Sequence, residues 1–229
     1  MIENFSLTEI NALLDFLIPF ITEERKNKFD SVIHNRLKSV NVVLEDVYQS
    51  HNTSAILRTC DLVGIQDIHF IENKNHYKIA EDVALGASQW LSINRHSSTE
   101  QCLADLKKKG YKIVATSPHE SGFTPLNLPI DYPITIVLGT EKNGISPIVK
   151  HHADYFLKIP MYGFTESYNV SVSAGICLHQ LTERMRLSNT EFSFGDLEKK
   201  KIYINWLLES IPKSEILVKE FKKNNKFAS

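Results

Sequence analysis

The strongest constraint on the fold is the alternation of short β-branched segments with helical patterns between residues 40 and 186. Strand-like segments lie at 40–44, 68–71, 111–115, 133–138 and 155–159. Apolar residues recur at helical spacing over 52–63, 99–109 and 169–186. This alternation predicts an α/β fold, with a mainly parallel sheet flanked by helices.

Helical patterns also stand on both sides of this region. Ser6-Leu7-Thr8-Glu9 matches a capping box, and the helix that follows is expected to end or kink at Pro19. A second helical pattern covers 22–38, and an amphipathic pattern covers 204–211. The predicted division is a helical N-terminal extension at 1–38, an α/β domain at 39–188 and a C-terminal helical tail at 189–229.

Composition adds four limits. The chain has 229 residues, of which 42% are hydrophobic, enough for one sizeable core. Its net charge is −1, so any nucleic-acid surface must be a local patch. We expect neither a signal peptide nor a membrane span, because no basic leader and no run of 18 apolar residues is present. Cys60, Cys102 and Cys177 are isolated along the chain, which favours a reducing cytoplasm over a disulfide framework or structural zinc site.

The first of three unusual loops joins a predicted strand to a helix and contains Asn52 and Arg58. Asn52 lies at the predicted start of the helix, and Arg58 lies more than one turn inside it. A guanidinium fork matches phosphate oxygens, so Arg58 is a candidate phosphate ligand. The alternative, which the spacing alone favours, is that Asn52 is only an N-cap and Arg58 forms a surface ion pair.

The other two loops follow the predicted strands at 133–138 and 155–159. Gly139 and Gly144 follow the first strand, which indicates backbone that approaches a ligand closely, although the lysine of a P-loop is absent. Residues 160–175 contain a long irregular loop and then the start of a helix of small residues, and the free backbone groups before the helix suit an adenine or a carboxylate. The alternatives are a plain strand-to-helix turn and tight core packing.

Together, the three segments resemble motifs 1, 2 and 3 of the SpoU family of RNA ribose methyltransferases, within the SPOUT superfamily. The matching elements are N-x5-R at 52–58, G-x-E-x-x-G-[IL]-S at 139–146 and I-P-M-x-G-x-x-x-S-x-N-V-S-[VI]-[SA]-A at 159–174. The resemblance covers about residues 36–188, and HNTSAILRTCDLVGI and VALGASQWL are most similar to the branch that methylates guanosine 18 of the tRNA D-loop. The sequence departs from the family pattern at Tyr168, where leucine is commoner, and at Ser50, where proline is common.

The resemblance implies a C-terminal trefoil knot in the α/β domain, a homodimer with active sites at its interface, S-adenosylmethionine as cofactor and tRNA as substrate. Arg58 matches the family's catalytic arginine. The other catalytic motif positions are Asn52, Glu141, Ser167 and Asn169. The residues expected to line the cofactor pocket are Thr116, Leu138, Gly139, Gly144, Ile159, Met161, Ser167, Tyr168 and Val170.

For the chemistry, we expect Arg58 to stay protonated, bind the substrate phosphate and organise deprotonation of the ribose 2′-hydroxyl, with Asn52 and Glu141 orienting it. We expect no metal, because the histidines show no ligand spacing along the chain. The predicted RNA-binding residues are Arg25, Lys26, Lys28, Arg36 and Lys38. The C-terminal lysines at 219, 222, 223 and 226 are either a solvated, frayed end or further RNA contacts.

Three other functions stay open at this point. Within the family, the target could be a ribose of ribosomal RNA or of the tRNA wobble nucleotide. The chain could also be an RNA-binding homologue that has lost catalysis, although the full set of motif residues argues against this. A nucleotide-hydrolysing enzyme is disfavoured, because both the Walker lysine and the GxGxxG fingerprint are absent.

Overall fold

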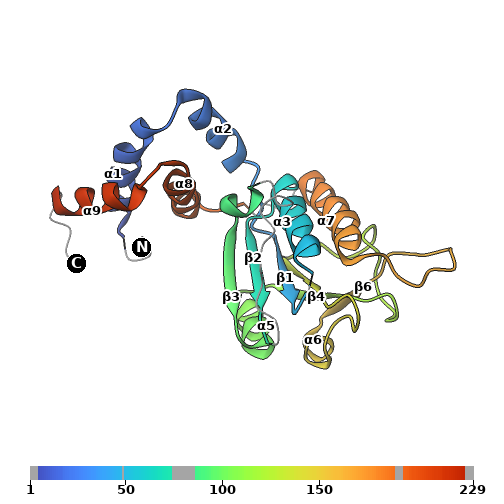
Figure 1. The fold of residues 1–229 in the computed structure, drawn as a ribbon. Coiled ribbons are helices and arrows are strands. Elements are labelled where there is room, and N and C mark those ends of the chain that lie inside the picture. Colours follow the sequence, from blue (N-terminus) through green and yellow to red (C-terminus); the bar gives the residue numbers. More distant parts are fainter. Residues whose placement is uncertain (1–4, 48, 74–85, 189–192, 225–229) are drawn as a thin grey trace. The chain divides into compact units, whose positions relative to one another are not determined.

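The computed structural model describes residues 5–47, 49–73, 86–188 and 193–224, and its internal contacts divide the chain into two compact units (Figure 1). The first, which we call the sheet unit, is Leu37–Ser193. The second, the helical unit, combines Met1–Arg36 with Phe194–Ser229, so the two chain ends belong to one unit. Each unit is described by itself.

The sheet unit is built on six parallel strands in the order β3-β2-β1-β5-β4-β6. Their bounds are β1 Val40–Glu45, β2 Asp67–Ile71, β3 Ser92–His96, β4 Lys112–Thr116, β5 Ile134–Leu138 and β6 Tyr155–Leu157. From β1 the strand order runs outward in both directions, to β2 and β3 on one side and to β5, β4 and β6 on the other. Where the order reverses, the loops after neighbouring strands separate and leave a crevice for ligands. Here that point lies at the carboxyl ends of β1 and β5.

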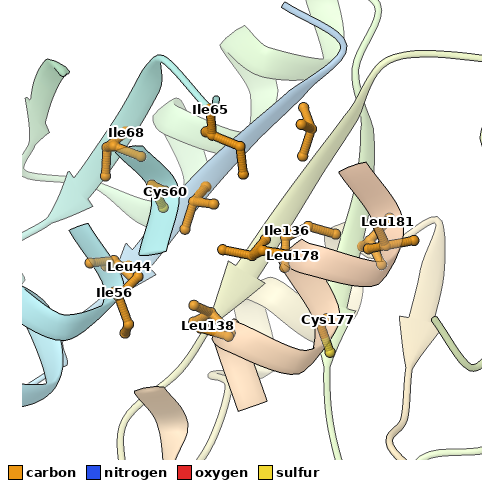
Figure 2. Packing of buried hydrophobic residues seen from close by; sticks show 14 of the residues in the cluster. Leu44, Ile56, Cys60, Ile65, Ile68, Ile136, Leu138, Cys177, Leu178 and Leu181 are labelled. Carbon is orange, nitrogen blue, oxygen red and sulfur yellow. The ribbon is translucent and has the colours of Figure 1, made fainter. Parts of the chain in front are cut away.

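Helices cover both faces of this sheet, and the alternation of side chains along each strand decides which residue meets which helix. The helices are α3 Ser50–Leu62, α5 Thr99–Lys108, α6 Pro147–His152 and α7 Val170–Leu187, with a 3-10 helix at Ala87–Trp90. Val42 and Leu44 pack with apolar residues of α3 and α7, whereas Val43 packs with those of α5 and α6. Figure 2 shows the first of these cores, where Ile56 and Cys60 of α3 and Leu178 and Leu181 of α7 approach β1 and β5.

The carboxylate of Glu45, at the end of β1, ties three elements together although its residue is only 3% exposed. It accepts hydrogen bonds from the Thr99 hydroxyl (2.8 Å), the Ser146 hydroxyl (2.7 Å) and the Ser146 backbone N–H (2.9 Å). Thr99 begins α5 and Ser146 is the N-cap of α6. A buried carboxylate needs such donors, and the positive ends of both helix dipoles favour its charge.

The helical unit consists of α1 Leu7–Leu17, a 3-10 helix at Ile18–Phe20, α2 Glu23–Ile33, α8 Asp196–Ser210 and α9 Ser214–Asn224. The capping box at Ser6 and Glu9 is formed, and α1 gives way to the 3-10 turn that contains Pro19. Phe29 of α2 contacts Trp206 of α8, with ring centroids 5.4 Å apart. Among the described helices of both units, none combines the length and apolarity needed to cross a bilayer.

The structure confirms the five predicted strands and adds β3, which the sequence did not reveal. β3 reads Ser-Ile-Asn-Arg-His, so only one residue has strong β propensity, and it forms as an edge strand paired to β2. The helix predicted over 22–38 ends at Ile33. The prediction of a frayed C-terminal end is wrong for residues 214–224, which form α9 and bury Val218 and Phe221. Lys226 lies outside the described residues.

Glu45→Gln tests the role of the buried carboxylate. The amide group of glutamine would place a donor against the Ser146 N–H or against the two hydroxyls, so we expect a loss of about 1–3 kcal/mol in the free energy of unfolding. Urea denaturation measures this loss. Glu183→Gln, an exposed glutamate of the sheet unit, is the control and should change stability by less than about 0.5 kcal/mol. Equal stability of the two variants would contradict the assigned role.

Candidate active site

A pocket of about 480 Å³ opens at the carboxyl ends of β4, β5 and β6. The segments that follow these strands form its wall, at 116–119, 138–145 and 157–170. All nine predicted cofactor residues line this pocket: Thr116, Leu138, Gly139, Gly144, Ile159, Met161, Ser167, Tyr168 and Val170. Loops that lie far apart in the sequence therefore enclose one space.

The loop after β5 is a tight hairpin, which differs from a plain strand-to-helix turn. Thr140 and Gly144 exchange two backbone hydrogen bonds of 2.9 Å, and Gly144 has φ of 64°, a conformation that favours glycine. A Cβ on Gly139 would stand 2.3 Å from the backbone carbonyl of Gly144. Both glycines are thus required by the loop's own backbone geometry, which brings main-chain groups to the pocket.

A chain of side-chain hydrogen bonds joins the three motif segments. The Asn52 amide donates to the Glu141 carboxylate (2.8 Å) and to the Gln49 side-chain oxygen (3.0 Å). The Asn169 amide donates to the Asn52 oxygen (3.1 Å), while its own oxygen accepts the Ser171 N–H (2.8 Å) at the start of α7. Asn52 thus uses both ends of its amide, which a carboxylate or an apolar residue could not do.

Asn52 is not the helix N-cap. Gln49 holds that position, and Asn52 is a buried residue of the first turn of α3. Two of its three partners, Glu141 and Asn169, come from other loops, and the interpretation of Asn52 as a simple cap is wrong.

Arg58 lies farther along α3, about 9 Å from Asn52 along the helix axis. It does not line the pocket, and its side chain is exposed. Within the described residues its guanidinium forms neither an ion pair nor a hydrogen bond, so the surface ion pair considered from the sequence is not found. No described residue therefore occupies any of its five donors, which could serve a ligand outside the chain.

Several residues line the pocket without having been found from the motifs, and three of them, Lys150, His119 and Cys177, carry ionisable side chains. Lys150 of α6 forms an ion pair of 2.7 Å with Glu120, and His119 lies in the loop after β4. Burial raises the pKa of the Cys177 thiol to about 12, so Cys177 is a neutral wall residue and not a nucleophile. They lie outside the three motif segments and carry no spacing signal, so only the structure places them here.

The predicted RNA-binding residues do not share one environment. Arg25 and Lys28 of α2 are exposed, whereas Lys26 pairs with Glu23 (3.4 Å) and Asp30 (3.7 Å). Arg36 does not fit the prediction: it is 2% exposed, and its guanidinium carbon lies 5.2 Å from the centroid of the Trp206 ring. Its guanidinium is buried inside the helical unit, so Arg36 does not belong to an RNA-binding surface. Lys38 is half-buried in the sheet unit.

Comparison with known proteins decides the family. The profile of the SpoU rRNA Methylase family matches residues 39–179. The chain belongs to the SpoU family. A tRNA (guanosine(18)-2'-O)-methyltransferase of Borreliella burgdorferi is 40% identical over 190 residues, covering 83% of this chain and 87% of that protein.

Solved structures of other SpoU proteins share the fold. The crystal structure of the Aquifex aeolicus TrmH/SpoU tRNA modifying enzyme superposes with a TM-score of 0.76 at 32% identity, covering 83% of this chain and 98% of the other. The SpoU methyltransferase AviRb of Streptomyces viridochromogenes, solved with the cofactor AdoMet, has a TM-score of 0.58 at 21% identity, covering 67% and 60%. The latter likeness concerns the fold alone.

Gly139→Ala tests the tight hairpin. The added methyl group would collide with the Gly144 and Ile145 backbone, which cannot move aside as a flexible side chain does. We expect a loss of about 1–3 kcal/mol in stability and a displaced loop. Gly163→Ala is the control, because a Cβ there meets nothing within 4 Å. Thermal unfolding of both variants decides the matter, and an unaffected Gly139→Ala protein would contradict the close approach.

Proposed function

We propose that the chain transfers a methyl group from S-adenosylmethionine to the ribose 2′-hydroxyl of guanosine 18 in the D-loop of tRNA. The observation that carries this proposal is the convergence of three motif loops on one pocket, with the Asn52–Glu141–Asn169 chain of hydrogen bonds beside it. The relative from Borreliella burgdorferi, at 40% identity, supports the choice of tRNA and of guanosine 18.

The pocket suits a cofactor that combines an adenosine with a charged amino-acid part. Its volume lies within the range of about 300–1,000 Å³ typical of small-molecule sites. Leu138, Ile159 and Val170 offer apolar surface for an adenine ring, and the hairpin offers backbone groups. Ser167 and Lys150 supply polar groups for the charged end. When bound, S-adenosylmethionine supplies an electrophilic sulfonium methyl group.

The remaining chemistry falls to the protein. Arg58 stays protonated, grips the phosphate of the substrate nucleotide and so orients the ribose, whose 2′-hydroxyl passes its proton to an oxygen of that phosphate as its oxygen takes the methyl group. Glu141, held by Asn52, keeps its carboxylate at the mouth of the pocket, and Asn169 fixes the beginning of α7 against the same amide. In this role the hydrogen-bond chain positions the reacting groups and does not itself accept the proton.

The active enzyme is a homodimer of this chain that works in the cytoplasm. Tyr162 and Phe164, in the loop that borders the pocket, are almost fully exposed, and Leu187 at the end of α7 is 84% exposed. Large exposed apolar side chains suit burial against a second copy, and Tyr162 and Phe164 stand close to the ligand site. The three free cysteines fit a reducing compartment.

The sheet unit also carries the trefoil knot implied by its family. A Cβ on Gly122 would stand 2.3 Å from the Phe156 carbonyl oxygen, and the Phe123 N–H donates to that oxygen at 2.8 Å. The Lys158 N–H in turn donates to the Phe123 carbonyl at 2.8 Å. The segment between β4 and β5 thus lies directly against β6, as expected of a loop through which the chain passes.

The decisive assay incubates the purified protein with labelled S-adenosylmethionine and unmodified tRNA, and maps the methylated nucleotide. We expect 2′-O-methylation at guanosine 18 and none on a transcript in which that position is changed. Ribosomal RNA and a tRNA altered only at the wobble nucleotide test the other family targets. Calorimetric binding of S-adenosylmethionine without any methylation would indicate a silent homologue, and methylation at another nucleotide would overturn the proposed target.

Arg58→Lys tests the phosphate fork. A point charge cannot replace two parallel donors, so we expect kcat to fall about 100-fold or more, while calorimetry shows unchanged cofactor affinity. The matched control is Arg95→Lys. Arg95 lies on the edge strand β3 and forms an ion pair with Glu72, so this variant should keep its activity. Near-normal turnover of Arg58→Lys would refute this role.

The exposed cations of α2 should contribute to tRNA affinity through phosphate contacts. Because each contact releases a counterion, removing Arg25 and Lys28 together should reduce the slope of log affinity against log salt by about 2. Filter binding at several salt concentrations measures the slope. Lys108→Ala, a 78% exposed lysine of the sheet unit, is the control. A slope unchanged in the double variant would exclude this part of α2 from the RNA surface.

A further inference from the structure

Three side chains of the ligand type preferred by zinc converge on the face of the sheet covered by α5. They are His69 of β2, His96 at the end of β3 and Cys102 of α5. Their donor atoms all lie within 4.8 Å of one another, and Nδ1 of His69 is 3.0 Å from Nε2 of His96. None of the three lines the pocket described above. We propose that His69, His96 and Cys102 bind a divalent transition ion of the Zn²⁺ class.

The fold explains why these residues meet. β2 and β3 are parallel neighbours in which Ile71 stands opposite His96, and His69 shares the face of Ile71 because side chains alternate along a strand. Ile71 packs in the same core as Cys102, which lies one turn after the start of α5. Spacing along the chain does not record which strands pair, so the three residues could not be grouped before the structure was known.

The site is carried by regular elements that hold it in place. His69 is 6% exposed and Cys102 is fully buried, whereas His96 is half-buried and leaves a side open to solvent. α5 is fixed by its Ser98 N-cap and by the bond from Thr99 to buried Glu45. Ligands on such elements lose little conformational entropy when an ion binds.

The protonation states of the two histidines favour binding, whereas the neutral Cys102 thiol must lose its proton to the ion. Burial lowers the pKa of His69 to about 4, with the charge of His96 adding to the effect, and burial lowers the pKa of His96 as well. Both rings are therefore neutral at pH 7, the form that coordinates metals. Burial raises the pKa of the Cys102 thiol to about 12. On binding, the thiol gives its proton to solvent and a metal–sulfur bond forms, so one proton is released for each ion bound.

The distances also suit this class of ion. Bonds of about 2.0–2.3 Å from zinc to nitrogen and sulfur place tetrahedral ligand atoms about 3.3–3.8 Å apart. The observed spacing, from 3.0 Å to at most 4.8 Å, brackets that range, so small rotations of the side chains complete the geometry. Water is the fourth ligand. The competing interpretation is a neutral histidine pair that only exchanges a hydrogen bond beside an inert thiol.

The experiment uses the full chain without a histidine tag, stripped with a chelator, reduced and titrated with Co²⁺ and then with Zn²⁺. We expect one ion per chain, a near-ultraviolet charge-transfer band from thiolate to Co²⁺, release of one proton and displacement of Co²⁺ by Zn²⁺. Cys102→Ala should lose the band, whereas Cys60→Ala, an equally buried free thiol in the other core, should keep it.

His96→Gln gives a second test that does not depend on a core residue, since His96 is half-buried on an edge strand. We expect its Zn²⁺ affinity, measured by competition with a chromophoric chelator, to fall at least tenfold, while exposed His151→Gln leaves it unchanged. Circular dichroism confirms that each variant is folded. No Co²⁺ binding, binding without the charge-transfer band, or a band that persists in Cys102→Ala would overturn the site. Methyl transfer is not part of any of these readouts.

Discussion

The parallel pairing of β1 with β5 is the constraint on which the sheet unit depends. The two strands run in register from Val40 opposite Ile134 to Leu44 opposite Leu138, and both contribute to the cores on each face. Because they are neighbours, the loops that follow them open side by side. Two polar contacts then join these same loops, from Ser146 to Glu45 and from Asn52 to Glu141. The strand pair that completes the core thus also positions the site.

The site combines a rigid base with an exposed rim. The strands beneath it are buried, and the hairpin at Thr140–Gly144 is closed by backbone hydrogen bonds. The segment that carries Tyr162 and Phe164 buries almost none of its apolar surface within the chain. Segments with few buried contacts open at a lower free energy than core strands do. Such a loop can admit a cofactor while the side chains of Glu141 and Asn169, joined through the Asn52 amide, keep their places.

Local patterns were enough to predict five of the six strands and most helices, whereas nine residues of the pocket were expected from the resemblance to the SpoU motifs. The apolar run before Gly139 marked β5, and the motif spacing marked loops whose backbone geometry has strict requirements, such as positive φ at Gly144. The sequence could not predict β3, whose polar residues become a strand only because β2 offers an open edge. The sequence also wrongly predicted that Arg36 is exposed. A basic residue at the end of a predicted basic helix is expected to face solvent, and the contact with Trp206 is known only from the structure.

Long-range partners explain the remaining gaps between sequence and structure. The polar partners of Asn52 come from two distant loops, so an N-cap was the simplest local interpretation although it was wrong. The same reasoning applies to His69 and His96, which meet only through strand pairing. In each case the residue type was informative, but the partner was set by the order of strands in the sheet.

The histidine and cysteine cluster and the pocket are connected through one helix. Cys102 and Thr99 stand three residues apart on α5, on neighbouring turns of one face, and Thr99 bonds Glu45, which in turn holds Ser146 after the glycine hairpin. Coupling along such a chain requires an element with two alternative arrangements. The buried bond between Thr99 and Glu45 favours a single arrangement of α5. An ion at Cys102 would therefore stabilise the existing arrangement of α5 at the base of the site. It would not shift α5 between two arrangements and so would not regulate the site.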